Sequence, residues 1–342
     1  WAGEAFGGWG GEVGTTPKAP EAQEAVVEVT VSPTISELVP ILTPSPTPEP
    51  LPTATPTLEP SPTAAAIEPP EPQAGDIRVV TRGSVEVEQV VVPAGSFMMG
   101  SDEGEDDERP AHAVTLDTFW IDQTEVTNAQ FAAFVAETGY ETTAEREGGG
   151  HIYSNQVWTL TPGANWQSPL GPGSDLERME DHPVVLVSWY DAEAFCAWRG
   201  GRLPTEAQWE YAARGPEAPI YPWGSTFIST NLNYCDRNCA LSWTDQAADD
   251  RYQFSAPVSS YASGASWVGA MDMAGNVWEW VNDYYAGDYY TNLPAQAPSG
   301  PQGGNQRVIR GGAWYNSANG VRATDRGHNE PDQRTDSIGF RC

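Results

Sequence analysis

The sequence has few positive charges and no long apolar run. Its 342 residues contain 17 Lys and Arg against 47 Asp and Glu, and Lys18 is the single lysine. Because nucleic-acid phosphates are bound by basic side chains, a formal net charge of −30 argues against a nucleic acid as the partner. A transmembrane helix needs a run of about 18 apolar residues, and the sequence contains none.

Cysteine and histidine are also scarce, with four residues of each. The histidines (His112, His151, His182 and His328) are widely separated and include no i, i+4 pair of the kind that binds a metal ion on a helix. Four cysteines allow three disulfide connectivities, and spacing alone does not choose between them. Disulfide bonds would imply an oxidising, extracytoplasmic compartment.

The first part of the chain is dominated by proline. Residues 1–74 hold 15 of the 30 prolines and ten glutamates but no cysteine. Such a segment cannot bury enough apolar surface to offset the entropy of ordering it, so we expect an extended chain. We predict that residues 1–76 are a disordered Pro/Thr/Glu-rich stalk or linker and that residues 77–342 form one folded domain. Because the first residue is Trp1 and not Met, a leader or a membrane anchor upstream of residue 1 is left open.

The folded part predicts an α+β domain with much irregular structure. Alternating apolar residues indicate strands that begin at Val85 and over residues 114–122. Three helices have N-terminal caps and glycine stops, which are Thr127 with Gly139, Ser188 with Gly200, and Thr205 with Gly215. The remaining part, about 125 residues, shows little periodicity, so its loops need disulfides, metal ions or tryptophan packing to hold them.

Four stretches in a fixed order carry a family resemblance. They are VPAGSFMMG (92–100) with WIDQTEVTN (120–128), PVVLVSW (183–189) with GRLPTEAQWEY (201–211), MAGNVWEW (273–280), and RGGAW (310–314) with IGFR (338–341). Together they resemble the formylglycine-generating enzyme (sulfatase-modifying factor) family over residues 85–342. The resemblance implies a variant of the C-type lectin fold.

The family's enzymes oxidise a sulfatase cysteine to formylglycine with O₂ and a copper ion held by two cysteines. Cu(I) is a soft ion that requires thiolate ligands. In this chain, Asn316 aligns with the first of these cysteines, Ala313 replaces the motif serine, and residues 314–331 contain no cysteine. We therefore expect no copper and no catalytic residues of the family type. A related sulfoxide synthase uses iron with histidines from an additional domain, which the four scattered histidines do not match.

The resemblance also implies a disulfide pairing. Cys196 and Cys342 match a structural disulfide of the family, which leaves Cys235 and Cys239 to close a local loop. The long bridge would close a loop of about 146 residues and would stabilise the fold by about 4–5 kcal/mol in the chain-entropy model. Metal binding by Cys235 and Cys239 is the alternative, but other ligands are lacking nearby.

Calcium is the cofactor that the resemblance implies, at two sites in the irregular part. Calcium binds carboxylate, amide and backbone-carbonyl oxygens, which Asn- and Asp-rich loops supply. The first expected site consists of Asn231, Leu232, Asp250 and Tyr252, and the second of Asp272, Met273, Gly275 and Val277. Alternatively, these Asp and Asn residues cap turns. The acidic run at 104–109 lacks ligand spacing and is expected to be a solvated loop.

In a lectin-type fold the late loops form the ligand-binding face. We expect a protein or peptide ligand to contact Trp278, Trp314, Tyr315, Asn316, Asn319, Arg322, Asp325, Arg326 and His328. Arg322 and Arg326 could instead form buried ion pairs with Asp325, Asp332 or Asp336. Variable proteins that diversify this segment share the fold, and one sequence does not show whether that applies.

These features together predict an extracytoplasmic, stalk-tethered domain that serves for recognition and not for oxidation. The alternative is a formylglycine-generating type of oxidoreductase with a divergent mechanism, which acts on a protein or peptide cysteine near Trp278 and Trp314. A third hypothesis is a sensor module attached to a membrane-bound kinase.

Overall fold

The computed structural model describes residues 72–154 and 157–342. The expected stalk, residues 1–76, lies almost entirely outside these residues. In the part of the chain that is described, no helix is both long enough and apolar enough to cross a membrane.

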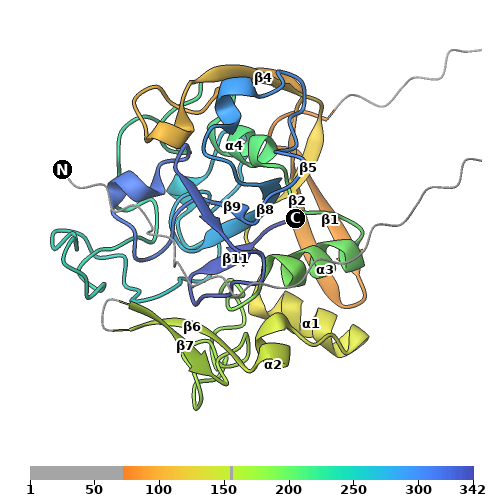
Figure 1. The fold of residues 1–342 in the computed structure, drawn as a ribbon, viewed down its shortest axis with the longest axis vertical. Helices are drawn as coiled ribbons and strands as arrows, with labels where there is room; N and C mark the ends of the chain where they lie inside the picture. Colours follow the sequence, from red (N-terminus) through yellow and green to blue (C-terminus); the bar gives the residue numbers. More distant parts are fainter. Residues whose placement is uncertain (1–71, 155–156) are drawn as a thin grey trace, which may run out of the picture. The chain divides into compact units, whose positions relative to one another are not determined.

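The described residues form an α+β domain of short strands, four α-helices and long irregular loops (Figure 1). The strands are β1 (Ile77–Arg82), β2 (Val85–Val92), β3 (Gly95–Met99), β4 (His112–Leu116), β5 (Phe119–Asp122), β6 (Gly149–Ser154), β7 (Val157–Pro162), β8 (Trp278–Tyr284), β9 (Arg307–Arg310), β10 (Arg326–Asn329) and β11 (Ile338–Phe340). The helices are α1 (Asn128–Thr138), α2 (Thr143–Glu147), α3 (Trp189–Arg199) and α4 (Glu206–Arg214), with short 3₁₀ turns at η1 (Asp106–Glu108), η2 (Ala262–Gly264), η3 (Tyr289–Asn292) and η4 (Ala318–Val321).

The three helices expected from their caps form at the predicted places. Thr127, Ser188 and Thr205 each accept a hydrogen bond from the backbone N–H three residues later, and each belongs to a capping box. The same signature at Thr142 and Glu145 starts α2, which was not predicted because a helix of five residues shows too little periodicity.

A four-stranded sheet with the order β10-β9-β8-β11 lies at the centre of the domain. The C-terminal strand β11 runs parallel to β8, while the other pairs are antiparallel. The predicted strand over residues 114–122 is wrong as a single element, because the chain changes sheets within it. β4 pairs with β3 and β5 pairs with β2, and between them the Thr118 hydroxyl accepts the Ala94 N–H at 3.0 Å.

Two hydrophobic clusters use alternate residues of the central sheet. Trp278, Trp280 and Ile309 pack with α1 and α3, whereas Val281 and Val308 pack with α4, β3 and β4. Successive strand residues point to opposite faces, so the two clusters cover the two faces of the sheet. In Figure 1, α4 lies beside β4 towards one end, and α1, α2 and the β6–β7 hairpin lie towards the other.

Candidate functional site

The aromatic residues of the expected ligand face are buried. Trp278, Trp314 and Tyr315 are each less than 7% exposed and belong to the cluster with α1 and α3. The Trp278 indole N–H donates to the Tyr315 hydroxyl at 2.9 Å, and the Trp314 backbone N–H donates to the Asn276 carbonyl at 2.9 Å. Burial raises the pKa of Tyr315. In the described structure these three side chains therefore contribute to packing and are not accessible to a ligand.

Asn316, which aligns with the first metal-binding cysteine of the family, closes a turn. Its side-chain oxygen accepts the Ala313 N–H at 2.9 Å, and its backbone N–H donates to the Ala313 carbonyl at 2.9 Å. Its own carbonyl accepts the Cys235 N–H at 2.9 Å. The side-chain amide thus satisfies the Ala313 N–H, and the other two hydrogen bonds use the backbone of residue 316.

The two arginines of the expected ligand face form ion pairs. Arg322 contacts the Glu108 carboxylate at 2.7 and 2.8 Å, and Arg326 contacts the Glu206 carboxylate at 2.7 and 3.0 Å. Asp325 is only a secondary partner of Arg322, at 3.6 Å. Glu108 is fully buried, so the expectation of a solvated loop at 104–109 is wrong for this residue. A signal was present in the sequence, because nearly all cations are arginines, which favour bidentate pairs with carboxylates.

The other residues of the expected face differ in exposure. Asn319 is exposed, and its backbone carbonyl and side-chain oxygen accept the Arg322 Nε–H. Asp325 and His328 are half-buried, and the His328 ring stacks on Tyr285 with 3.9 Å between ring centroids. Burial raises the pKa of Asp325 to about 7 and lowers the pKa of His328. The structure therefore leaves a small polar surface at this segment.

All four cysteines form disulfides, and the pairs are those implied by the resemblance. Cys196 in α3 bonds to Cys342 after β11, and Cys235 bonds to Cys239. Among residues 72–154 and 157–342, no group of three or more His, Cys, Asp or Glu side chains could hold a metal ion. With no free thiol and an amide at position 316, the residues do not fit a copper–thiolate centre.

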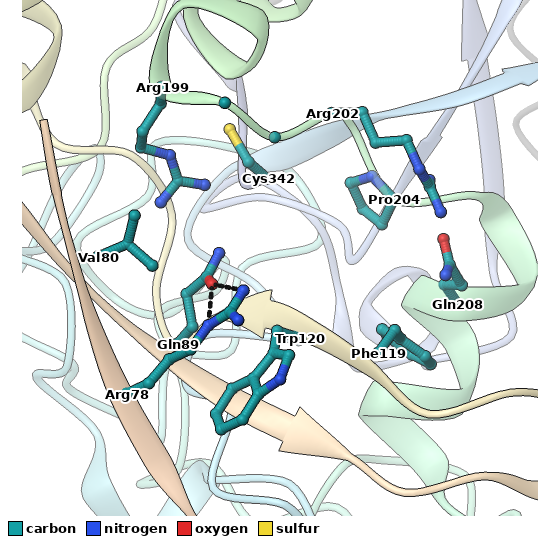
Figure 2. A pocket seen from close by; sticks show the side chains of 12 residues that line it. Arg78, Val80, Gln89, Phe119, Trp120, Arg199, Arg202, Pro204, Gln208 and Cys342 are labelled. Atoms are coloured by element: carbon teal, nitrogen blue, oxygen red, sulfur yellow. Dashed lines mark hydrogen bonds between the residues drawn. The ribbon is translucent and has the colours of Figure 1, made fainter.

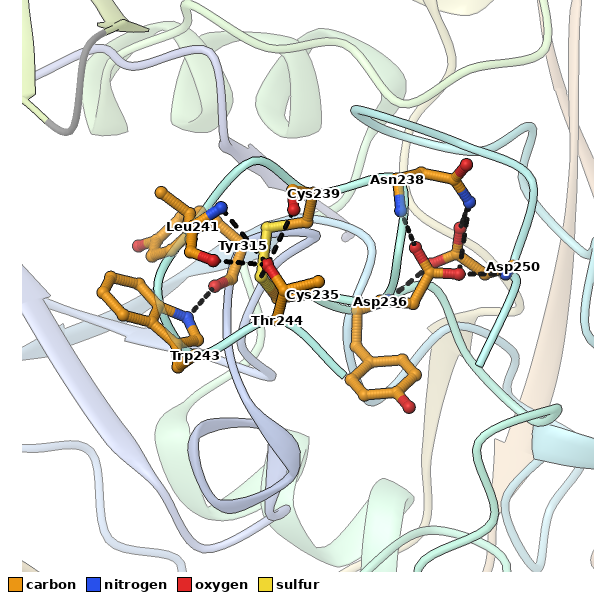
Figure 3. The surroundings of a disulfide bond; sticks show 10 residues. Cys235, Asp236, Asn238, Cys239, Leu241, Trp243, Thr244, Asp250 and Tyr315 are labelled. Atoms are coloured by element: carbon orange, nitrogen blue, oxygen red, sulfur yellow. Dashed lines mark hydrogen bonds between the residues drawn. A yellow bond between two sulfur atoms is a disulfide. The ribbon is translucent and has the colours of Figure 1, made fainter. Parts of the chain in front are cut away.

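The Cys235–Cys239 disulfide lies between the 313–316 turn and an acidic loop (Figure 3). On one side, the Trp243 indole N–H donates to the Tyr315 carbonyl at 2.8 Å. On the other side, Asp236 accepts hydrogen bonds from the backbone N–H groups of Asn238 and Asp250. The chain around the disulfide is therefore hydrogen-bonded both to the segment that follows β9 and to the first expected calcium site.

At the first expected calcium site, the two carbonyls are free of hydrogen bonds. The Leu232 and Tyr252 carbonyls accept none from the described residues. Burial, with the nearby Asp236 carboxylate, raises the pKa of Asp250 to about 6. A cation bound here would accept the free carbonyl oxygens as ligands and would reduce the repulsion between the Asp236 and Asp250 carboxylates. Asp236 was not among the expected ligands, although it lies only four residues after Leu232.

The second expected calcium site has a similar pattern. The Met273 and Gly275 carbonyls also lack hydrogen-bond partners within the described residues. Burial raises the pKa of Asp272 to about 6 and, together with Asp272, raises that of the fully buried Glu125. One Glu125 oxygen has no hydrogen-bond partner in the described part of the chain. Glu125 was missed because it lies far from Asp272 in the sequence. Calcium sites take many carbonyl oxygens, so both places fit this ion even without a cluster of three carboxylates.

Comparison with known proteins agrees with this architecture. A family model described as the sulfatase-modifying factor enzyme 1-like domain matches residues 75–342. The chain is 40% identical over 305 residues to a Streptomyces coelicolor protein named formylglycine-generating enzyme, with 82% of this chain and 94% of the relative covered. It is 37% identical over 277 residues to a mouse protein named inactive C-alpha-formylglycine-generating enzyme 2, with 74% of this chain and 84% of the relative covered.

A solved structure agrees with the sequence comparisons. The structure of PvdO from Pseudomonas aeruginosa is similar to this chain with a TM-score of 0.61 and 27% identity, and the match covers 79% of this chain and 97% of that one. The family model's match over residues 75–342 includes the capped helices and the central sheet. The chain therefore belongs to the formylglycine-generating enzyme (sulfatase-modifying factor) family.

Proposed function

We propose that this protein is an extracytoplasmic recognition or sensor domain that binds a protein or peptide without oxidising it. The observation that carries this proposal is the absence of free thiols at the place where the family's enzymes bind copper. Asn316 closes a backbone turn, and every cysteine of the chain is in a disulfide. Copper-dependent oxidation would require two thiolates at this place. Since one relative is itself named as inactive, membership in the family is compatible with a loss of oxidation.

The two disulfides support an oxidising location. Disulfides persist in extracellular and periplasmic compartments and are rare in the cytosol. The polar surface around Asn319, Asp325 and His328 offers amide, carboxyl and imidazole groups to a peptide ligand.

A peptide oxidation assay tests the proposal. The purified full chain is incubated with Cu(I), O₂ and a peptide that carries the sulfatase cysteine motif, and the product is followed by intact mass and by an aldehyde-reactive hydrazide. We expect the peptide mass to remain unchanged and no aldehyde to form. The Streptomyces coelicolor relative serves as the positive control under the same conditions. Aldehyde formation by this chain would overturn the proposal.

We also propose that calcium stabilises the irregular loops. The free carbonyls of Leu232, Tyr252, Met273 and Gly275 support it, as do the raised pKa values of Asp250 and Asp272. Removing a bound ion with a chelator should lower the melting temperature, because a ligand that binds only the folded state stabilises it by mass action. Added calcium should restore the melting temperature, and magnesium at the same concentration should not. An unchanged melting temperature on chelation would rule out this role.

One observation favours the alternative of a divergent oxidoreductase. Burial raises the pKa of both Asp325 and Asp336 to about 7, and carboxyl groups with such values can exchange protons near neutral pH. If this alternative holds, the peptide cysteine is oxidised in the assay without added copper, and Asp325→Asn or Asp336→Asn abolishes the product. The absence of product in the copper-free reaction would exclude it.

A further inference from the structure

A pocket of about 170 Å³ lies between β1, β5 and the α3–α4 connection, beside Cys342 (Figure 2). Three arginines from separate places in the sequence line it: Arg78 in β1, Arg199 at the end of α3, and Arg202 in the connection. Gln89, Trp120 and Gln208 also line it, but no Asp or Glu side chain does. The lining is therefore cationic.

Arg199 is a buried charge with unused donors. Its side chain is 1% exposed, and its single ion pair is with Asp122 at 2.7 Å. None of its three guanidinium nitrogens makes a hydrogen bond of acceptable geometry in the part of the chain that the structure describes. Asp122 also accepts hydrogen bonds from the Gln89 side chain and the Cys342 N–H, so its charge is shared among several donors. The positive potential of Arg199 is thus only partly offset.

Arg78 is held at the pocket by neutral groups. Its Nε and Nη2 donate to the Gln89 side-chain oxygen at 2.9 and 2.7 Å, and its guanidinium lies 4.5 Å from the centre of the Trp120 ring. The amide of Gln89 orients the guanidinium and is itself neutral, so the positive charge of Arg78 is not balanced. A carboxylate at this position would balance it. Burial and the Arg199 charge lower the pKa of Arg78.

Arg202 completes the set and also lacks an acidic partner. Its Nη1 donates to the Leu203 carbonyl at 3.0 Å, and neither Arg202 nor Arg78 has an ion pair within the described residues. Most arginines of this chain do have one, including Arg310, Arg322, Arg326 and Arg341. Although the chain has 47 acidic residues and a net charge of −30, Asp122 is the one carboxylate that pairs with any of these three arginines within the described residues, and it pairs with Arg199 alone. An anion bound at this pocket would balance the excess.

We propose that the arginine pocket of Arg78, Arg199 and Arg202 is a binding site for an oxyanion, namely the phosphate, sulfate or carboxylate group of a ligand. Arg78 and Arg202 are exposed and donate hydrogen bonds to the anion. The buried Arg199 contributes positive electrostatic potential to the pocket. The pocket is distinct from the residue 313–338 segment on which the proposed function depends, so each can fail without the other.

Isothermal titration of the full chain with sodium phosphate, sodium sulfate and sodium acetate, at an ionic strength matched with sodium chloride, tests the site. We expect saturable binding of at least one anion. Arg78→Gln and Arg202→Gln should each weaken it about tenfold, because each removes a charge-assisted hydrogen bond. Arg178→Gln is the matched control, since Arg178 is exposed and lies outside the pocket, and it should bind as the wild type does. The melting temperature of each variant without anion shows that it folds.

The three anions also separate the ligand classes. Binding of phosphate or sulfate alone assigns the pocket to a phosphoryl or sulfuryl group, and binding of acetate alone assigns it to a carboxylate. If no anion binds the wild type, or if both pocket variants bind with wild-type affinity, the proposal is wrong.

Discussion

The two halves of the domain are stabilised in different ways. The first half, residues 85–215, contains all four α-helices, and its helix starts are fixed by capping boxes and apolar faces. The second half, residues 216–342, contains no α-helix among its residues, all of which are described. Its chain is held by the Cys235–Cys239 disulfide, by the central sheet and by buried arginines.

The buried arginines show how the second half is attached to the first. Arg310 contacts Glu210 and Arg326 contacts Glu206, so two arginines from late strands meet carboxylates of α4. Burying both charges costs about as much as their attraction returns, so such pairs specify an arrangement more than they add stability. Irregular loops, which lack a repeating hydrogen-bond pattern, gain a defined position from these directional contacts.

Removal of each disulfide should give the largest expected difference in the free energy of unfolding. Cys196–Cys342 joins the two halves over 146 residues, whereas Cys235–Cys239 spans four residues within the second half. In the chain-entropy model, the double alanine variant of the first pair should lose about 5 kcal/mol of unfolding free energy, and that of the second about 2 kcal/mol. Urea denaturation measures both. Equal losses would show that loop length does not govern the effect.

Breaking a buried ion pair of the second half should lower the free energy of unfolding by nearly as much as removing the long disulfide. Arg341 contacts both oxygens of Glu279 at 2.6 Å, and both side chains are fully buried. Arg341→Met leaves a buried carboxylate without its partner and should cost about 3–5 kcal/mol in urea denaturation. The matched control is the half-exposed pair Arg82–Glu137, which joins the end of β1 to α1 of the first half, and Arg82→Met there should cost less than about 1 kcal/mol.

A second variant distinguishes the unpaired charge from lost packing. Adding Glu279→Gln to Arg341→Met removes the buried charge and should recover part of the loss. If the double variant is no more stable than the single one, the effect comes from packing around Arg341 and not from the carboxylate.

The difference between the helical first half and the irregular second half also explains which features could be predicted from the sequence. The helices after Thr127, Ser188 and Thr205 were predicted at the right residues, because a cap, an apolar face and a glycine all lie within one short window. The family resemblance added the fold and the disulfide pairs. The break of residues 114–122 into β4 and β5 was missed because the apolar alternation continues through the change of sheet.

The candidate site was less predictable because its contacts join distant residues. Glu108 is 214 positions from Arg322, and Glu206 is 120 positions from Arg326. No local pattern connects such pairs, and a polar residue in a loop can equally face solvent or a buried partner. Trp314 and Tyr315 were expected to contact a ligand, since aromatic residues are common both at binding surfaces and in cores.

The pH dependence of stability should reveal an unpaired carboxyl in the second half. Asp336 is buried, accepts the Tyr153 N–H at 2.8 Å and has no ion pair in the described residues. Burial raises its pKa to about 7. The folded protein therefore keeps this proton between about pH 4 and 7 while the unfolded chain loses it, so the free energy of unfolding falls as the pH rises, by up to about 4 kcal/mol.

Asp336→Asn should remove this contribution. The variant should match the wild type near pH 4 and be the more stable of the two at pH 8, as measured by urea denaturation at each pH. Other buried carboxyls, such as Asp283, act on both proteins equally and cancel in the difference. Parallel pH profiles for the two proteins would contradict the raised pKa.

The smallest expected effects come from local hydrogen bonds, and here the two halves should behave alike. Thr127 caps α1 by accepting the Gln130 N–H, and Asn316 closes its turn by accepting the Ala313 N–H at 2.9 Å. Thr127→Ala and Asn316→Ala should each lower the free energy of unfolding by about 1 kcal/mol, measured by urea denaturation. Similar losses would assign the difference between the halves to disulfides and ion pairs alone. A much larger loss at Asn316 would show that this turn organises the loops around it.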